Sequence, residues 1–187
     1  MFITEFLKSP GSVGAIKPSS KYLAAEMVKQ ARISQADTII ELGAGTGAFT
    51  GLIYQTKKPE ASFVALEINE NLSQILTEKL PEVDVITDSV ENLKQIMADK
   101  GIDKLDSIVC GLPWAAFGPE LQDKLFTSIV NAMTPGGRFC TFAYLQGLLL
   151  PAGQRFRKTL RQNFTEVTQS RTVWRNTPPA FIYNCIK

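Results

Sequence analysis

Short apolar runs alternate along the chain with segments in which apolar residues recur every three or four positions. Continuous short runs are typical of strands that are buried on both faces of a parallel sheet. Recurrence at three and four positions predicts a helix with one buried face. The expected strands are residues 37–42, 62–67, 83–86, 105–110 and 138–144. Their alternation with helices predicts an α/β fold, in which helices cover both faces of a mostly parallel sheet.

The helical segments lie before, between and after these strands. A helix over 19–31 is expected first, because serine caps a helix well and Leu23, Met27 and Ala31 recur at a spacing of four. Three further helical stripes are marked by Leu72, Ile75, Leu76 and Leu80, by Val90, Leu93 and Met97, and by Leu121, Leu125 and Ile129, with the last helix closing at 135–137. After a basic helix at 154–162, two β-rich runs at 165–173 and 180–186 predict an antiparallel pair that finishes the sheet.

Length and composition predict a single domain over residues 1–187, since 44% of the residues are hydrophobic and no linker or repeat interrupts the pattern. No apolar run approaches the roughly 18 residues of a membrane span and no signal peptide is visible, so a cytoplasmic protein is expected. Residues 1–7 place apolar side chains on one side, but they are too few for a stable isolated helix in water. We therefore predict an N-terminal amphipathic helical extension within 1–32 that serves as a lid or membrane-contact segment, with packing on the core as the alternative.

Charge is unevenly distributed, although the net charge is only +2. Residues 1–32 and 150–187 together carry 12 basic and three acidic side chains, whereas residues 33–149 carry eight basic and fifteen acidic ones. The basic ends indicate a surface that meets an anion, either lipid headgroups or nucleic acid. The chain has no histidine, which excludes Ser-His and Cys-His nucleophile systems and histidine-ligated metal sites. Its three cysteines are predicted to be buried reduced thiols, and no metal site is expected.

Glycines follow the first predicted strand directly, in the stretch ELGAGTGAFT. Gly43, Gly45 and Gly47 allow a tight turn and let the backbone approach a ligand at the start of the next helix. Glu67 ends the second strand about 20 residues further on, where an acid can hydrogen-bond both ribose hydroxyls. The pair predicts a nucleoside cofactor, and the pattern suits nicotinamide and adenosylmethionine enzymes alike.

The spacing Glu41-x-Gly43-x-Gly45-x-Gly47 resembles the first motif of class I S-adenosylmethionine-dependent methyltransferases, in which the acid lies by the methionine end of the cofactor. Asp88-Ser89 resembles the acid-bearing position that faces adenine in that family. The resemblance implies S-adenosylmethionine as cofactor and a Rossmann-like, mostly parallel seven-stranded sheet with an antiparallel last strand. The cofactor-binding residues expected on this basis are Glu41, Gly43, Ala44, Gly45, Gly47, Glu67, Ile68, Asp88, Ser89 and Cys110.

The segment Gly111-Leu112-Pro113-Trp114 follows the fourth strand, where this class binds the methyl acceptor. Carbonyl groups freed by a proline-containing loop can accept hydrogen bonds from an amine, and Trp114 offers a flat face to a cation or base, unless it is simply packed in the core. The segment resembles the N-L-P-Y motif of adenine-dimethylating ribosomal RNA enzymes, but Gly111 replaces the asparagine. Nucleic acid is therefore the weaker candidate as substrate, also because no added RNA-binding domain is visible.

The stretches VGAIKPSS, GLP at 111–113, PGG before Tyr144 and WRNTPPAFIY resemble bacterial phospholipid N-methyltransferases. The resemblance implies methylation of phosphatidylethanolamine towards phosphatidylcholine at an anionic membrane surface. The start of helix 19–31 could hold a lipid phosphate, through Lys17, Ser19 and Ser20, with plain helix capping as the alternative. Trp174, Arg175 and Asn176 are expected to close the headgroup pocket.

Methyl transfer to an ethanolamine headgroup requires the amine to be neutral, and histidine cannot take its proton here. Tyr144 is the first candidate for that role, with Tyr22, water, or carbonyl groups of Gly111 and Leu112 that orient the amine as alternatives; Pro113 belongs to the same candidate catalytic segment. Two other functions stay open: a nucleic-acid adenine methyltransferase, and a catalytically idle lipid-binding protein that binds adenosylmethionine.

Overall fold

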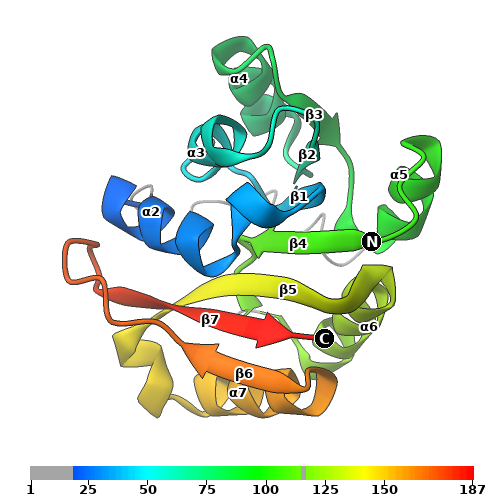
Figure 1. Cartoon of the computed structure of the whole chain (residues 1–187). Helices are drawn as coiled ribbons and strands as arrows, with labels where there is room; N and C mark the ends of the chain where they lie inside the picture. Colours follow the sequence, from blue (N-terminus) through cyan, green and yellow to red (C-terminus); the bar gives the residue numbers. More distant parts are fainter. Residues whose placement is uncertain (1–18, 115–116) are drawn as a thin grey trace.

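The computed structural model describes residues 19–114 and 117–187, and these form a seven-stranded sheet with helices on both faces (Figure 1). The strand order is β3-β2-β1-β4-β5-β7-β6, and only β7 runs antiparallel to its neighbours. The strands are β1 (Thr38–Leu42), β2 (Ser62–Glu67), β3 (Asp84–Thr87), β4 (Leu105–Cys110), β5 (Met133–Tyr144), β6 (Glu166–Gln169) and β7 (Ala180–Ile186). The predicted sheet, with its antiparallel last strand, is confirmed.

Two buried cores lie on opposite faces of this sheet because neighbouring strand residues point in opposite directions. Ile39 belongs to the core under α2–α4, whereas Ile40 belongs to the core under α5–α7. The helices are α2 (Lys21–Gln30), α3 (Thr50–Thr56), α4 (Glu70–Lys79), α5 (Leu93–Asp99), α6 (Pro119–Ala132) and α7 (Pro151–Asn163). Short 3₁₀ helices η2 (Val90–Asn92) and η4 (Leu145–Leu149) precede α5 and α7. The sequence pattern gave no sign of η4.

Strand β5 begins at Met133, earlier than the predicted residue 138. The segment 135–137 therefore lies within the strand rather than closing the preceding helix. Its pairing with β4 is shifted between Leu105 and Ser107, and Gly136 adopts a φ of 78° there, so a local irregularity absorbs the proline and glycines. In contrast, β6 ends at Gln169. Beyond it, the predicted run to 173 is continued by a hydrogen bond from the Ser170 N–H to the Ile182 carbonyl and by an isolated bridge between Val173 and Ala180.

Helix α2 is the described part of the segment 1–32 that the sequence predicted to be a lid or membrane contact. The apolar side of this helix contacts the sheet and no membrane: Leu23 and Met27 have no exposed surface and pack in the core under α2–α4. The lid or membrane-contact role of the segment stays a prediction. The apolar stripe at a spacing of four is the reason, since it faces the sheet rather than solvent. The amphipathic segment 1–7 and Lys17 lie outside the described residues.

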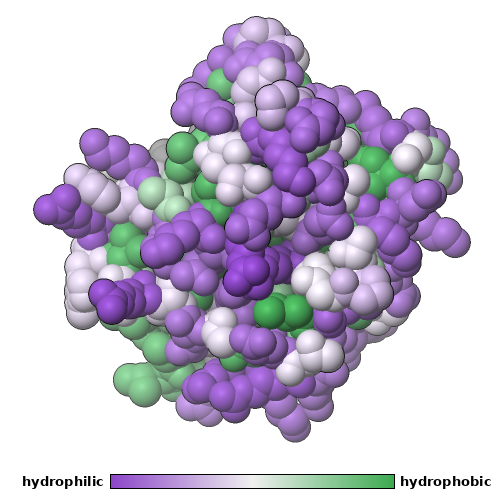
Figure 2. Space-filling view, in the orientation of Figure 1, coloured by the Kyte–Doolittle hydropathy of each residue, from purple (hydrophilic) through white to green (hydrophobic). Residues whose placement is uncertain are grey.

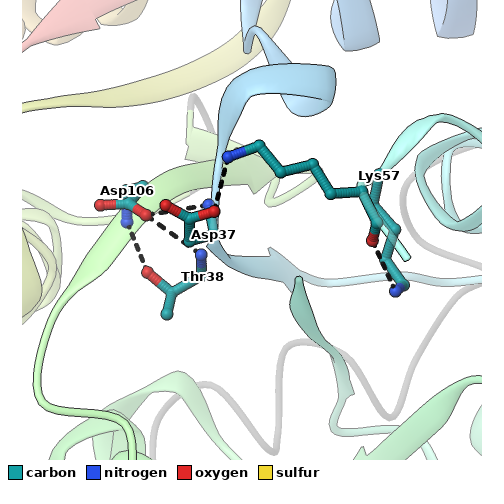
Figure 3. A network of polar contacts seen from close by, with 5 residues as sticks. Asp37, Thr38, Lys57 and Asp106 are labelled. Carbon is teal, nitrogen blue, oxygen red and sulfur yellow. Dashed lines mark hydrogen bonds and ion pairs between the residues drawn. The ribbon is translucent and has the colours of Figure 1, made fainter. Parts of the chain in front are cut away.

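The amino-terminal ends of β1 and β4 are joined by a polar network (Figure 3). The Asp106 carboxylate accepts hydrogen bonds from the backbone N–H groups of Asp37 and Thr38, at 3.0 and 3.1 Å. The Thr38 hydroxyl in turn accepts one from the N–H of Asp106, at 3.0 Å. This clamp fixes the register of the two central strands, so that their opposite, carboxyl ends meet at a defined place.

No helix of the described chain is long and apolar enough to cross a bilayer.

Candidate functional site

The loops that follow β1 and β4 lie directly against each other at the carboxyl edge of the sheet. Gly43 donates its N–H to the Leu66 carbonyl of β2 at 2.8 Å, and Gly111 donates to the Leu42 carbonyl of β1 at 2.8 Å. A Cβ added to Gly111 would lie 2.6 Å from the Gly43 carbonyl oxygen, so only glycine fits there. Open α/β sheets bind ligands at this edge, where the strand order changes direction from one side of β1 to the other.

Glu67 holds the glycine loop from the end of β2. Its carboxylate accepts hydrogen bonds from the N–H groups of Gly45, at 2.7 Å, and Asn69, at 2.9 Å. Each carboxylate oxygen keeps a second lone pair, so ribose hydroxyls could still donate to it. Gly45 has a φ of 56°, and a Cβ there would meet no atom within 4 Å. The backbone beside Glu67 is therefore open to a ligand.

Glu41 lies at the end of β1 with no exposed surface, and neither of its carboxylate oxygens has a hydrogen-bond partner among the described residues. Burial raises the pKa of Glu41 to about 8; the neighbouring Thr50 hydroxyl lowers this pKa, and the Glu67 carboxylate raises it. A buried carboxyl group without partners is costly, which is the reason such groups are rare unless a ligand completes them. A cationic ligand group would supply the missing interaction.

Asp88 and Ser89 follow β3 and, with Ile68, line a polar hollow of about 540 Å³. One Asp88 oxygen accepts hydrogen bonds from the Ser89 N–H, at 2.6 Å, and from the Asn92 side chain, at 2.7 Å. Ser89 caps η2 by accepting a hydrogen bond from the Glu91 N–H at 3.2 Å. The predicted adenine-side residues are therefore brought together, and the loop that carries them is held in shape by its own hydrogen bonds.

Three observations test whether these residues suit adenosylmethionine: the unpartnered buried carboxyl of Glu41, the open space at Gly45 and the hollow beside Asp88. Together they offer a group for a cation, a backbone surface and a polar recess along one edge. Gly47 and Ala44 shape the same turn, in which the Gly47 N–H donates to the Ala44 carbonyl at 3.0 Å. The residues therefore fit the predicted cofactor.

Cys110 ends β4 beside this edge and is fully buried. Burial raises the pKa of its thiol to about 12, so the sulfur stays protonated at neutral pH. The chain's three cysteines are all buried and free, as predicted. The neutral thiol is only a weak hydrogen-bonding group. A strong hydrogen bond from Cys110 to a cofactor would therefore have to come from its backbone.

An apolar cavity of about 370 Å³ opens on the other side of Gly111. Its walls are residues 111–114, the end of β5, η4, the first turns of α7, and Tyr183 of β7. The predicted acceptor segment Gly111–Pro113 therefore separates the glycine loop from this cavity, within reach of both. The volume lies within the range of roughly 300–1,000 Å³ that is usual for small-molecule sites.

The sequence predicted that Trp114 offers a flat face to a cation or base. This prediction is wrong, because the ring is not exposed. The side chain is 3% exposed and stacks on Phe126, with ring centroids 4.3 Å apart. It also packs against Phe117, Phe139 and Phe156. The physical reason is the hydrophobic area of the indole ring, which gains more from an aromatic core than from the surface. Trp114 therefore forms the inner wall of the apolar cavity.

The two candidate tyrosines lie in different places. Tyr144 ends β5 and lines the apolar cavity, and burial raises the pKa of its phenol above the usual value of 10. The phenol therefore stays neutral near pH 7 and can orient an amine, but it cannot serve as a tyrosinate base. Tyr22 is 40% exposed on α2, is not part of the cavity wall, and lies under Arg175 at 4.9 Å from its ring centroid.

The predicted phosphate and headgroup residues are used partly by the chain itself. Ser20 caps α2, its hydroxyl accepting a hydrogen bond from the Leu23 N–H at 3.2 Å. Asn176 is 4% exposed: its side chain accepts from the Ser20 N–H at 2.9 Å and donates to the Pro178 carbonyl at 2.7 Å. Asn176 therefore ties the 174–179 loop to α2, a structural role that sequence reasoning missed. Ser19 is partly exposed beside this cap, and Trp174 is 72% exposed.

Sequence reasoning also missed Thr50 and the η4–α7 wall of the cavity. The Thr50 hydroxyl is buried without a hydrogen-bond partner in the described structure, next to Glu41. Its position at the start of α3, directly after the glycines, was the signal that could have found it. The η4–α7 wall depends on Gly147 and Gly153, which no motif marks.

Replacing Glu67 with alanine is expected to weaken adenosylmethionine binding about tenfold, because the predicted ribose hydrogen bonds to its carboxylate would be lost. The variant also frees the Gly45 N–H that Glu67 holds at 2.7 Å, so the glycine loop loses an anchor. Calorimetric titration with the cofactor measures the effect, and circular dichroism checks the fold. An affinity equal to that of the unmodified protein would remove Glu67 from the cofactor site.

Comparison with known sequences places this arrangement among methyltransferases. The sequence family described as "Methyltransferase domain" matches residues 33–182. An ornithine lipid N-methyltransferase from Singulisphaera acidiphila is 30% identical over 188 residues, which cover 99% of this chain and 94% of that protein. A ribosomal RNA small subunit methyltransferase A from Thermotoga petrophila is 26% identical over 130 residues, 65% of this chain but only 46% of that protein.

A comparison with solved structures supports the same fold. The crystal structure of an O-methyltransferase from Bacillus cereus in complex with SAH matches with a TM-score of 0.73 at 14% sequence identity. The match covers 98% of this chain and 89% of that chain.

Proposed function

Because this chain belongs to the class I S-adenosylmethionine-dependent methyltransferases, we propose that it methylates the amine of a membrane lipid, with phosphatidylethanolamine as the first candidate acceptor. The observation that carries the proposal is the apolar cavity beside Gly111–Pro113, since a lipid brings an apolar body together with its amine. The similarity over nearly the whole chain to an ornithine lipid N-methyltransferase supports an amine-bearing lipid as acceptor.

In this proposal the cofactor lies along the carboxyl edge of β1–β4. The Glu67 carboxylate accepts hydrogen bonds from the ribose hydroxyls. The adenine is surrounded by Ile68, Asp88 and Ser89, and Glu41 faces the cationic methionine end. The sulfonium of adenosylmethionine supplies an already activated methyl group. The protein's task is then to align the acceptor nitrogen and to exclude water, which needs no covalent intermediate.

The acceptor nitrogen would lie at Gly111–Pro113, where backbone carbonyl groups can accept its hydrogen bonds. The Tyr144 phenol, kept neutral by burial, would orient the nitrogen from the end of β5. The proton that an ammonium headgroup must lose would pass to water, because the chain lacks histidine and Tyr144 is not ionised near pH 7. The basic ends of the chain would hold the enzyme at the cytoplasmic face of an anionic membrane.

Nucleic-acid adenine methylation is less well supported. The ribosomal RNA enzymes that the 111–114 segment resembles carry an asparagine where this chain has Gly111. The backbone of this protein leaves no space for such a side chain, since even a Cβ would meet the Gly43 carbonyl oxygen at 2.6 Å. Trp114 is also covered by phenylalanine rings and cannot stack on a flipped base in this arrangement.

Methyl transfer from labelled adenosylmethionine to defined vesicles tests the proposal. Vesicles that contain phosphatidylethanolamine, vesicles that contain ornithine lipid, and ribosomal RNA are offered in parallel to the full chain. We expect methylated phosphatidylethanolamine. Methylation of ornithine lipid alone would support lipid N-methylation but show that phosphatidylethanolamine is not the acceptor. Methylation of RNA without any lipid product would contradict the proposal, and cofactor binding without turnover on any amine would favour the idle lipid-binding alternative.

A further inference from the structure

The cavity beside Gly111 extends from an exposed rim to a fully buried floor. The rim includes the exposed side chains of Gln146 and Leu150, the latter 55% exposed, whereas Trp114, Phe156 and Tyr183 at the floor are each less than 5% exposed. Among the described residues that line it, the two tyrosine phenols are the only ionisable groups. The charged groups of a lipid headgroup would therefore find no ionic partner along most of the depth of this cavity. The cavity is suited to hydrocarbon instead.

Small residues keep this cavity open. Gly147 of η4 and Gly153 of α7 meet so closely that a Cβ on Gly153 would collide with the Gly147 carbonyl oxygen. Ala143 and Ala152 add further short side chains to the wall. The close contact fixes η4 against α7, so the cavity is a built feature of the fold rather than a chance gap between loose loops.

Most of the large exposed apolar side chains lie at the same edge of the sheet as the cavity. Among the described residues, five large hydrophobic side chains are exposed, and four of them lie at the carboxyl edge: Tyr22, Leu149, Leu150 and Trp174, at 40, 85, 55 and 72%. Leu149 and Leu150 follow β5, and Trp174 lies just before β7, whose first residue pairs with Tyr144. In Figure 2 hydrophobic surface is visible at the lower left, over the corner where η4 meets α7 in Figure 1.

Helix α7, which begins at this corner, and the chain that leads to β7 are basic. Helix α7 carries four exposed basic side chains and no acidic one: Arg155, Arg157, Lys158 and Arg161. Arg171 and Arg175 lie exposed on the chain that leads to β7. Exposed leucine and tryptophan side chains surrounded by cations match the chemistry of an anionic lipid surface, which offers hydrocarbon below a layer of negative headgroups. Neither an RNA strand nor an acidic peptide would account for the apolar cavity behind them.

We propose that the η4–α7 corner docks on an anionic lipid surface and that the cavity behind it receives one hydrocarbon chain of a membrane lipid. The chain enters past Leu149 and Leu150, and its end lies against Trp114, Phe156 and Tyr183. This rests on the proposed function only for the identity of the headgroup, which is then held at Gly111–Pro113. The acceptor reaches the methyl donor without leaving the bilayer completely.

Photolabelling tests the cavity directly and needs neither cofactor nor turnover. The probe is a phosphatidylethanolamine with a diazirine near the end of one acyl chain, placed in vesicles that also contain phosphatidylglycerol. We expect the label in peptides that contain the cavity floor, Phe156 and Tyr183. Label confined to the outer surface, or none at all, would overturn the proposal even if methylated lipid is formed. Floor labelling without any methylated product would uphold it while removing the proposed function.

Two matched substitutions test the docking corner. Leu149→Ser is expected to weaken binding to the same vesicles about tenfold, the factor for withdrawing one leucine side chain from hydrocarbon. Ile75→Ser is the control, because Ile75 is 52% exposed on α4, away from the corner. Equal losses in the two variants, or none in Leu149→Ser, would overturn the docking surface. Cofactor affinity, measured by calorimetry, reports whether each variant is folded.

Filling the cavity provides a second readout. Ala152→Phe, on the wall of the cavity, is expected to raise the KM for a long-chain lipid at least tenfold while leaving the affinity for adenosylmethionine unchanged. For lipids with shortened chains the KM should rise less, since such chains fill less of the cavity. The same loss for every chain length would contradict a hydrocarbon site.

Discussion

Glu41→Gln is expected to remove a pH dependence of stability that the unmodified protein shows between pH 4.5 and 8. The pKa of Glu41 is raised by burial from 4.5 to about 8 in the folded chain. A carboxyl group with a raised folded-state pKa stabilises the fold fully below its unfolded pKa, and this contribution is lost as the pH rises through the folded pKa. Between pH 6 and pH 8, the free energy of unfolding should therefore fall by about 2 kcal/mol more in the unmodified protein than in the variant.

Urea unfolding of the cofactor-free protein at the two pH values measures this difference. Glu60→Gln is the matched control, since Glu60 is exposed in the turn before β2 and should leave the pH dependence intact. The groups that bear on the pKa of Glu41 are the Thr50 hydroxyl, which lowers it, and the Glu67 carboxylate, which raises it. The nearby Cys110 thiol is neutral throughout because its pKa is about 12. An unmodified protein with equal stability at pH 6 and pH 8 would contradict an unpartnered carboxyl at this position.

The same carboxyl should couple cofactor binding to protons. A cation beside Glu41 favours the carboxylate and lowers its pKa, so binding of adenosylmethionine releases a proton below pH 8. Affinity should therefore rise about tenfold between pH 6.5 and pH 8 in the unmodified protein and stay nearly flat in Glu41→Gln. Calorimetry in two buffers of different ionisation enthalpy counts the protons released, and a count of zero would remove Glu41 from the cationic end of the cofactor.

The sheet was predictable from the sequence because its central strands are continuous apolar runs with polar ends. The bounds of β2 and β4 agree with the prediction, and both are buried on their two faces. The predicted start of β5 was wrong, because Pro135 and Gly136 normally end an element, whereas pairing of Met133 with Leu105 of β4 begins the strand before them. Local preference was overridden there by neighbouring strands that the sequence does not place.

The arrangement of the proposed cofactor residues could be predicted further than that of the proposed acceptor residues. Glu41, the glycines and Glu67 lie within one β-α-β unit, so their spacing along the chain fixes their spacing in the fold. The acceptor side depends on distant contacts: Asn176 bonds the backbone of Ser20, 156 positions away, and Gly153 packs on Gly147. Trp114 could not be assigned to core or surface until the phenylalanine rings around it were in place.

Gly111→Asn is expected to be strongly destabilising, because it places a side chain where the loops after β1 and β4 touch. The added Cβ would lie 2.6 Å from the Gly43 carbonyl oxygen, a backbone atom that can move only if the glycine loop moves with it. Overpacking against backbone costs typically 1–3 kcal/mol, and the branched amide should bring the loss in unfolding free energy to about 3 kcal/mol. Because Gly43 belongs to the loop that is proposed to hold the cofactor, affinity for adenosylmethionine should fall as well.

Gly118→Asn is the matched control, because it makes the same substitution at the other end of the segment between β4 and α6. A Cβ on Gly118 would meet no atom within 4 Å, and Gly118 is the N-cap residue of α6, a position that asparagine favours. Stability and cofactor affinity should therefore be unchanged or slightly improved in this variant. A Gly111→Asn protein that unfolds at the same urea concentration as Gly118→Asn would show that the two loops are not in contact. It would also restore the adenine methyltransferase as a candidate, because an asparagine would then fit at position 111.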